Sequence, residues 1–179
     1  MKHPPNETIF DVLEYLFDRC LPADGADAAD EAAVAVLTGE LAAAGFSAHG
    51  IARAFAWLEQ MWEMCDAVSA DDKNKTAAGG EGAAAAARRA PIRQYSGAEA
   101  AAIGAEGQGL FLSLERAGIM DNRTREIVID RLMALGEEDM ALEDIKWVVL
   151  LVLGNHPHKR EMVDRAEHMM LADAPAFLH

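Results

Sequence analysis

The chain has 179 residues, of which 51% are hydrophobic, and a formal net charge of −14 at pH 7. This length is enough for one ordinary domain or two small ones, and this apolar content excludes a disordered chain. The negative charge argues against general affinity for nucleic acid or anionic membranes, because both depend on Lys and Arg side chains that neutralise phosphates. Abundant Ala, Leu, Glu and Met favour an all-α, mainly helical fold.

The charge is divided unevenly along the chain. Residues 1–72 carry three basic and 14 acidic side chains, residues 73–96 carry five and one, and residues 97–179 carry eight and 15. Two cysteines, Cys20 and Cys65, are too few for a disulfide framework in a chain of this length, and nothing resembles an export signal. The sequence therefore predicts a cytoplasmic protein with reduced thiols.

Three helices are predicted in an N-terminal module, residues 1–68. Thr8 is the expected cap of the first helix, with Asp11 near the positive end of its dipole. The second is expected over about residues 28–44, where a glycine follows as a stop. Ser47 is the expected cap of the third helix.

The third helix, IARAFAWLEQMWEMC, has two apolar stripes at helical spacing. The first stripe is sufficient for a core and consists of Ile51, Phe55, Leu58 and Trp62. The second consists of Trp57, Met61 and Met64, and it either packs inside the same chain or meets a partner. These three residues, with Phe177 and Leu178 near the C-terminus, are therefore candidate partner-binding residues.

Residues 69–90, SADDKNKTAAGGEGAAAAARRA, contain no large apolar residue from which a core could be built. An alanine helix with nothing to pack on is marginal in water. The sequence therefore predicts a flexible Ala/Gly-rich linker between the first module and a C-terminal four-helix module, residues 91–179.

The second module is expected to begin with at most one short extended segment, residues 91–95. Ser96 and Asp121 are the expected N-caps of its first two helices, and Gly118 and Gly136 are their expected C-terminal stops. The four helices of the module are predicted over residues 97–117, 122–135, 142–154 and about 159–171.

The stretch LEDIKWVVLLVLGNHPH, residues 142–158, has seven consecutive apolar residues, far fewer than the roughly 20 that cross a bilayer. A helix that is apolar nearly all round is surrounded by other helices, so this one is expected to be central. Lys146 must then reach water or pair with a carboxylate. His156 and His158 are only two potential ligands and predict no metal site.

No motif in the sequence indicates an enzymatic reaction, a cofactor or a small-molecule substrate. Glu126 and Asp130 stand one helical turn apart, but Arg123, Arg125 and Arg131 in the same helix favour a solvated charged face over a paired-carboxylate site. The sequence LSLERAGIMDNRTREIVIDRL resembles a helix-turn-helix, although its acids oppose duplex DNA binding.

Arg88, Arg89 and Arg93 are the better candidate nucleic-acid-binding residues. They lie at the end of the predicted linker, and a mobile basic arm can follow an RNA or DNA backbone. The alternative is that these three charges only keep the linker soluble.

Several blocks, in the same order across nearly the whole chain, resemble the bacterial Smg family. They are IFDVLEYLF, LAAAGFSAHGIARAFAWLEQM, IRQYSGAEA, LERAGIMDNRTREIVIDRLMAL, LEDIKWVVLLVLGNHP and the terminal FLH. The resemblance implies a cytoplasmic protein of undefined biochemical role, without catalytic residues, often encoded near genes for DNA processing and translation. A shorter block, GFSAHGIARAFAWLE, also resembles the three-helix repeats of RecX-type regulators.

The sequence therefore leaves two main functions open. The first is a non-catalytic helical interaction protein whose acidic modules bind an unidentified protein or ribonucleoprotein partner, without cofactor, metal or membrane. The second is a nucleic-acid-associated or ribosome-associated accessory factor that acts through the linker arginines. An enzyme is the third possibility, and it requires a site where charges distant in the sequence converge, such as Glu126, Asp130 and Lys146.

Overall fold

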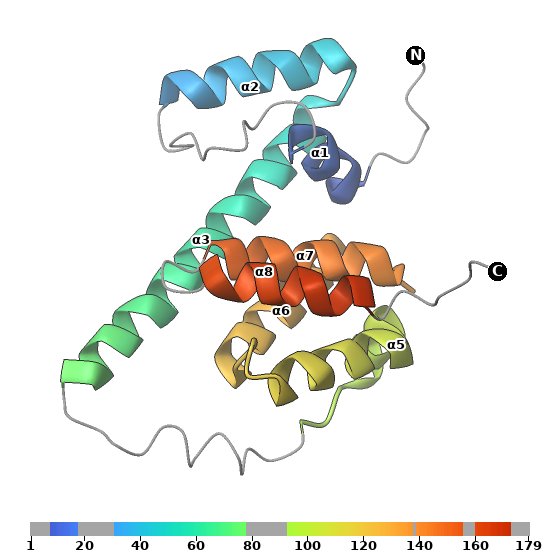
Figure 1. Ribbon diagram of the computed structural model, residues 1–179. Coiled ribbons are helices and arrows are strands. Elements are labelled where there is room, and N and C mark those ends of the chain that lie inside the picture. Colours follow the sequence, from blue (N-terminus) through green and yellow to red (C-terminus); the bar gives the residue numbers. More distant parts are fainter. Residues whose placement is uncertain (1–7, 18–30, 78–92, 138, 156–159, 173–179) are drawn as a thin grey trace. The chain divides into compact units, whose positions relative to one another are not determined.

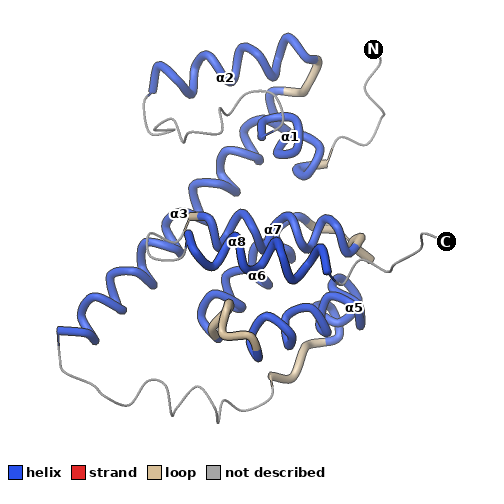
Figure 2. The backbone as a smooth tube through the Cα atoms, viewed as in Figure 1, coloured by secondary structure: helices blue, strands red, loops and turns tan. Residues whose placement is uncertain are grey.

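The computed structural model describes residues 8–17, 31–77, 93–137, 139–155 and 160–172 (Figure 1). Its helices are α1 (Ile9–Tyr15), α2 (Glu31–Ala44), α3 (Ala48–Ala77), α5 (Gly97–Arg116), α6 (Asn122–Leu135), α7 (Leu142–Gly154) and α8 (Arg160–Ala172). No strand occurs in these described ranges, and residues 93–96 form a loop (Figure 2). The all-α class predicted from the sequence is confirmed.

The expected N-caps are present at the starts of the helices. Thr8 and Asp11 form a capping box on α1, with distances of 2.9 Å and 3.1 Å between backbone nitrogen and side-chain oxygen. Ser47 Oγ accepts a hydrogen bond of 3.0 Å from the backbone N–H of Gly50 in α3. Asp121 accepts one of 2.8 Å from the N–H of Thr124 in α6. Each cap satisfies a backbone donor that the helix itself leaves unpaired.

Glycine ends α5 and α6 as the sequence predicts. Gly118 and Gly136 adopt positive φ angles of 67° and 75°, a left-handed conformation that other residues rarely accept. After α5, the backbone N–H of Ile119 donates to the carbonyl of Leu114 at 3.0 Å, which closes the last turn.

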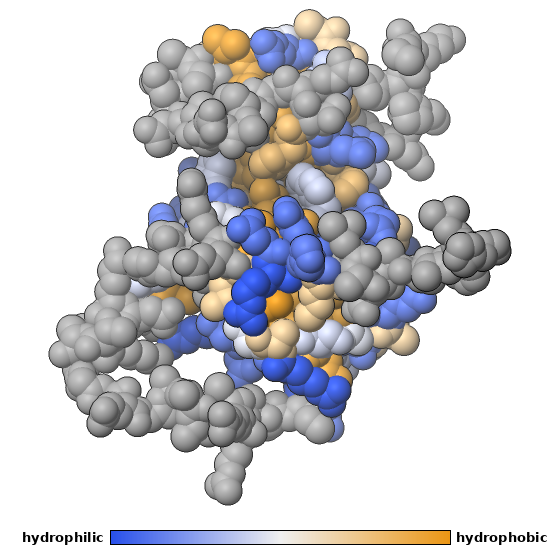
Figure 3. All heavy atoms as spheres, in the orientation of Figure 1, coloured by the Kyte–Doolittle hydropathy of each residue, from blue (hydrophilic) through white to orange (hydrophobic). Residues whose placement is uncertain are grey.

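The chain divides into two compact units, Met1–Gln60 and Met61–His179. The first contains α1, α2 and the start of α3. Its buried apolar side chains are Ile9, Val12, Leu13, Leu16, Leu41, Phe46, Ile51, Ala54, Trp57 and Leu58. The rings of Tyr15 and Phe46 meet edge to face, with centroids 5.3 Å apart. Along α2, apolar residues also reach the molecular surface (Figure 3).

Helix α3 continues through Ala77, into the segment that was expected to be a linker. Ser69 is buried, and its hydroxyl donates a hydrogen bond of 2.9 Å to the carbonyl of Cys65. Adding residues to an established helix avoids the unfavourable nucleation that limits isolated polar or alanine helices. Residues 69–77 are therefore helical, and residues 78–90 lie outside the described part of the chain. The border between the compact units also falls inside α3, and the extents of the two modules stay predictions.

The second unit is built around α7, which contacts α5, α6 and α8. Its buried side chains are Ile145, Val148, Val149, Val152 and Leu153. They pack in a core to which α5 contributes Phe111 and Leu114 and α6 contributes Val128 and Leu132, all fully buried. The placement of α7 agrees with its nearly continuous apolar sequence.

Helix α5 is interrupted at Gly104, which the sequence did not predict. Gly104 has a φ of 66° and a ψ of 175°, a combination open essentially to glycine alone. The carbonyl of Ala102 accepts a hydrogen bond of 3.1 Å from the backbone N–H of Met140, in the loop before α7. This bond satisfies a backbone acceptor beside the interruption.

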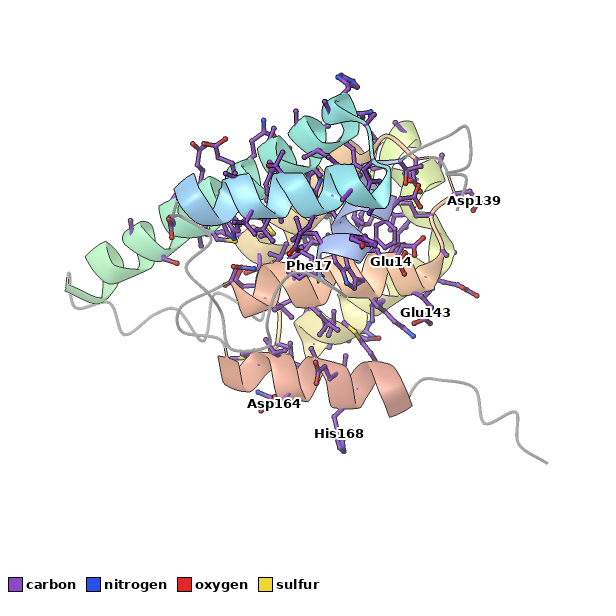
Figure 4. All side chains as sticks on the ribbon, turned by 90° about the horizontal axis from the view of Figure 1, so that it is seen from above. Glu14, Phe17, Asp139, Glu143, Asp164 and His168 are labelled. Atoms are coloured by element: carbon purple, nitrogen blue, oxygen red, sulfur yellow. The ribbon has the colours of Figure 1, made fainter. Side chains whose placement is uncertain are left out.

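Helix α8 packs one face on the second unit and leaves the other in solvent. Ala166 and Met170 are buried, whereas Asp164 and His168, one turn apart, are exposed and point away from α7 (Figure 4). Arg165 also donates a hydrogen bond of 3.1 Å to the carbonyl of Ala117, just after α5. This contact places a cation at the negative end of the α5 dipole.

Candidate functional site

The most extensive polar constellation in the described residues lies in the second unit, and we name it the Arg93 cluster. It consists of Arg93, Glu99, Glu115, Arg125 and Glu126. These residues come from the loop before α5, from both ends of α5, and from the first turns of α6. Two guanidinium groups therefore meet three carboxylates.

Arg93 is held by both of its carboxylate partners at once. Its two terminal nitrogens donate to the two oxygens of Glu99 at 2.9 Å each, and its Nε donates to Glu126 at 2.8 Å and 3.0 Å. Such forked pairs are the stronger kind of charge-assisted hydrogen bond. The Arg93 side chain is 19% exposed, so its charge is largely enclosed.

Glu99 connects this ion pair to the start of α5. Its carboxylate accepts a hydrogen bond of 2.8 Å from the backbone N–H of Ser96, while Ser96 Oγ accepts one of 3.2 Å from the N–H of Glu99. The two residues thus form a capping box, in which a glutamate at the third helical position is favoured. One carboxylate both caps the helix and binds Arg93.

Arg125 extends the cluster along α6 and back to α5. It donates to Glu126 Oε1 at 2.9 Å and 3.1 Å, and to Glu115 Oε1 at 2.5 Å. Only 9% of the Arg125 side chain is exposed. Because a buried guanidinium without a partner is strongly destabilising, these carboxylates are required by the position of Arg125.

The ion pairs shift the pKa values of their members. Hydrogen bonds from Arg93 and from the backbone of Ser96 lower the pKa of Glu99 from an ordinary 4.5 to about 2. Hydrogen bonds to Glu99 and to Glu126 raise the pKa of Arg93 further above its ordinary value. Burial alone would raise the pKa of Glu126, but hydrogen bonds from Arg93 and Arg125 outweigh it, and the pKa is lowered.

Tyr95 borders the cluster, with its ring centroid 5.0 Å from the Arg93 guanidinium carbon. This is within cation–π distance. Desolvation raises the pKa of the Tyr95 hydroxyl, so Tyr95 is neutral at pH 7. The cluster therefore consists of fixed charges held in pairs, an arrangement that fastens the loop before α5 to α5 and α6.

Of the three candidate nucleic-acid-binding residues, only Arg93 belongs to the described part of the chain. Arg93 lies in the ion pairs just described, so its charge is already neutralised by Glu99 and Glu126. Arg88 and Arg89 lie outside the described residues. A role for the basic arm in binding nucleic acid stays a prediction.

Two of the candidate partner-binding residues on α3 are buried: Trp57 is 3% exposed and Met61 is 0% exposed. Met64 is half-buried, and Phe177 and Leu178 lie outside the described residues. Of the two alternatives for this stripe, the burial of Trp57 and Met61 favours packing within the chain. The first stripe, which the sequence predicted to form the core, is not fully buried, because its Phe55 and Trp62 are only half-buried.

Trp62 has a polar role that the sequence did not indicate. Its indole Nε1 donates a hydrogen bond of 3.1 Å to Asn155 Oδ1, and Asn155 Nδ2 donates one of 2.8 Å to the carbonyl of Leu151. The end of α7 is thereby fastened to α3. Asn155 was expected only as a helix stop, and its amide supplies this second contact.

The remaining charged candidates are also paired. Glu126 binds Arg93 and Arg125, whereas Asp130 pairs with Arg131, so the two acids do not form a paired-carboxylate site. Arg125 and Arg131 are buried, which removes two of the three arginines from the surface of the proposed helix-turn-helix. Lys146 pairs with Glu143 at 3.0 Å, the carboxylate contact expected for it.

Neither a metal site nor a membrane-spanning helix is found in the described ranges. No group of three or more His, Cys, Asp or Glu side chains there is arranged to hold a metal ion. No helix in the same ranges is long and apolar enough to cross a bilayer. Cys65 is buried, like a small apolar core residue.

One surface, on α2, was not predicted from the sequence. Val36 is 61% exposed, and Gly39 lies one turn beyond it with open space around its Cα. The signal that could have indicated this surface is the helix composition. EAAVAVLTGELAAA is apolar without having a polar face, and it contains a glycine in mid-helix.

Comparison with known proteins assigns the family. Residues 9–179 match the family described as "Protein of unknown function (DUF494)". The chain is 36% identical over 173 residues to the "Protein Smg homolog" of Methylococcus capsulatus, covering 97% of this chain and 99% of that protein. It is 37% identical to the homolog of Alkalilimnicola ehrlichii over the same shares. The Aeromonas salmonicida homolog is 34% identical, covering 96% of this chain and all of that protein. No solved structure matches. The chain belongs to the Smg (DUF494) family, as its sequence blocks predicted.

Proposed function

We propose that this chain is a non-catalytic interaction protein of the cytoplasm, which binds a protein or ribonucleoprotein partner through exposed apolar helix surfaces. The observation that carries this proposal is the exposure of Val36 on α2 and Leu112 on α5, at 61% and 45%. Large apolar side chains on a folded surface mark interaction sites when they belong to a wider apolar face. Val36 belongs to such a face, because Ala35, Ala42 and Ala43 of α2 are exposed as well.

The pairing of the charged residues supports a non-catalytic role. Arg93, Arg125, Arg131 and Lys146 each bind a carboxylate of the same unit. A general acid, a general base or an electrostatic catalyst must be able to reach a substrate. These side chains would have to break an ion pair first, so their arrangement suits stability better than catalysis.

The test is photo-cross-linking in living bacteria. A photoreactive amino acid is placed at position 36 or position 112 of the full chain, and at the exposed Glu63 of α3 as the control position. We expect position 36 or 112 to yield a discrete adduct that position 63 does not. Mass spectrometry identifies the adduct, and RNase treatment separates a protein partner from a ribonucleoprotein. Identical adducts at all three positions, or none at any, would overturn the proposal.

A further inference from the structure

Helix α2 exposes an apolar surface that the other described parts of the chain do not cover. Of its described side chains, residues 34–44, Leu41 alone is buried. Val36 is the most exposed large apolar side chain in the described residues, at 61%. Gly39, Glu40 and Ala43 lie one and two turns further along the same side and are exposed as well. We name these four residues the α2 surface.

Gly39 gives a second, independent reason to regard the α2 surface as a binding site. A glycine inside a helix costs about 0.5–1 kcal/mol relative to alanine, so a packing reason is expected for it. No atom lies within 4 Å of the position that a Cβ would occupy, and its φ is not positive. Nothing in the packing of the described residues requires glycine here. A glycine that leaves a gap on an exposed helix lets another backbone approach closely.

The charge of the first unit indicates the chemistry of the partner. Residues 1–60 contain ten acidic and three basic side chains. Glu40 lies on the α2 surface itself, one turn from Val36. Complementary potentials speed association and select partners, so an exposed apolar side chain beside a carboxylate, in a unit whose sequence is acidic, fits a basic segment with an apolar face.

We propose that the α2 surface binds an amphipathic, basic helix of a partner protein, with the partner backbone crossing α2 at Gly39. The partner's apolar side chains pack on Val36 and Ala43, and its Lys or Arg side chains face Glu40. This inference rests on the proposed function and adds the surface and the class of partner. Leu112 also lies one turn from an open glycine, Gly109, but Glu106 and Arg116 of opposite charge flank it. The α5 surface is therefore the matched control.

The probe is a fluorescent synthetic peptide that forms a helix with leucines on one face and lysines on the other. Two comparison peptides carry the same leucines with glutamates in place of lysines, or the same composition in scrambled order. Fluorescence anisotropy with the full chain measures the affinity. We expect the basic amphipathic peptide to bind, more weakly as salt is raised, and the other two to bind at least about tenfold more weakly.

Four variants locate the binding surface. Gly39→Ala is expected to raise the melting temperature by about 2 °C, because alanine is the better helix former and meets no atom. The same substitution is expected to weaken peptide binding at least about fivefold, because the added methyl keeps the partner backbone away. Gly109→Ala is also expected to raise the melting temperature, but to leave peptide binding unchanged. Val36→Ser is expected to weaken binding about tenfold, and Glu63→Ser, at the exposed control position of α3, is expected to leave it unchanged.

Three outcomes would contradict the inference. If Gly39→Ala and Val36→Ser bind the peptide as tightly as the original chain, or if the acidic peptide binds equally well, the inference is wrong. If cross-linking at position 36 captures a partner that lacks a basic helix, the inference fails and the proposed function stands. If neither cross-linking nor peptide binding is detected, both fail together.

Discussion

Gly107 and Gly109 are two residues apart on α5, yet their surroundings are opposite. A Cβ on Gly107 would stand 2.7 Å from Ile103 Cγ2 and 2.8 Å from Ile145 Cδ1, whereas a Cβ on Gly109 would meet nothing within 4 Å. Gly107 is buried where α5 lies against α7, and Gly109 is exposed. The same residue type therefore serves close packing at one position and has no packing role at the other.

We predict opposite signs for the two alanine substitutions. Gly107→Ala is expected to lower the free energy of unfolding by about 1–3 kcal/mol, because the methyl group overfills a packed core. Gly109→Ala is expected to raise it by about 0.5–1 kcal/mol through helix propensity. Urea denaturation followed by circular dichroism measures both. Equal effects of the two substitutions would show that α5 and α7 do not approach as described.

Gly104 leads to a third prediction at the residue scale. Its φ of 66° is strained for any residue with a Cβ, although the space around it is open. Gly104→Ala is expected to destabilise the chain by about 1–3 kcal/mol despite the absence of a steric neighbour. The same denaturation experiment tests it. A stability equal to that of Gly109→Ala would mean that α5 runs straight through this position.

At the scale of the element, the sequence predicted the helix ends well and the ion pairs poorly. Thr8, Ser96 and Asp121 were recognisable as caps because capping depends on residues within one turn, all of them adjacent in the sequence. Arg93 and Glu126 are 33 positions apart, and no local pattern joins them. The interruption at Gly104 was also not predicted, because most single glycines within a helical pattern leave the helix continuous.

The pH dependence of the Arg93 cluster can be predicted from the pKa of Glu99. Because the folded-state pKa of about 2 lies below the ordinary 4.5, the carboxylate stabilises the fold above pH 4.5. That contribution is lost as the pH falls from 4.5 toward 2. Glu99→Gln can keep the hydrogen bond from Ser96 through its carbonyl oxygen, but it removes the charge and one of the two oxygens that accept from Arg93. We expect it to cost about 1–2 kcal/mol at pH 7, as charged hydrogen bonds near a surface do.

The difference between the original chain and Glu99→Gln should therefore shrink as the pH approaches 2. Urea denaturation at pH 7, 5, 4 and 3 follows it. Glu106→Gln, at an exposed position of the same helix, is the control and is expected to show no comparable difference. A Glu99→Gln effect that stays constant from pH 7 to pH 3 would show that the Arg93–Glu99 pair does not stabilise the fold.

At the scale of the whole molecule, charge leads to a prediction that distinguishes the two functions proposed for the chain. The net charge is −14, and the basic segment 73–96 lies between two acidic ones. Each phosphate contact needs a cation that is free to displace a counterion. Arg93 is engaged with Glu99 and Glu126, so at most Arg88 and Arg89 among the three candidate arginines remain for such contacts.

We therefore predict no measurable binding of single-stranded RNA or DNA by the chain at a salt concentration of about 150 mM, because two cations supply too little counterion release. Fluorescence anisotropy with labelled oligonucleotides measures this, and Arg88→Ala/Arg89→Ala is the matched variant. Binding in low salt that is steeply weakened by added salt and lost in that variant would instead favour the nucleic-acid-associated function.

Arg93→Ala separates the structural role of Arg93 from a role in binding nucleic acid. It should lower stability, since it leaves Glu99 and Glu126 without their shared cation, while leaving any oligonucleotide binding by the other two arginines unchanged.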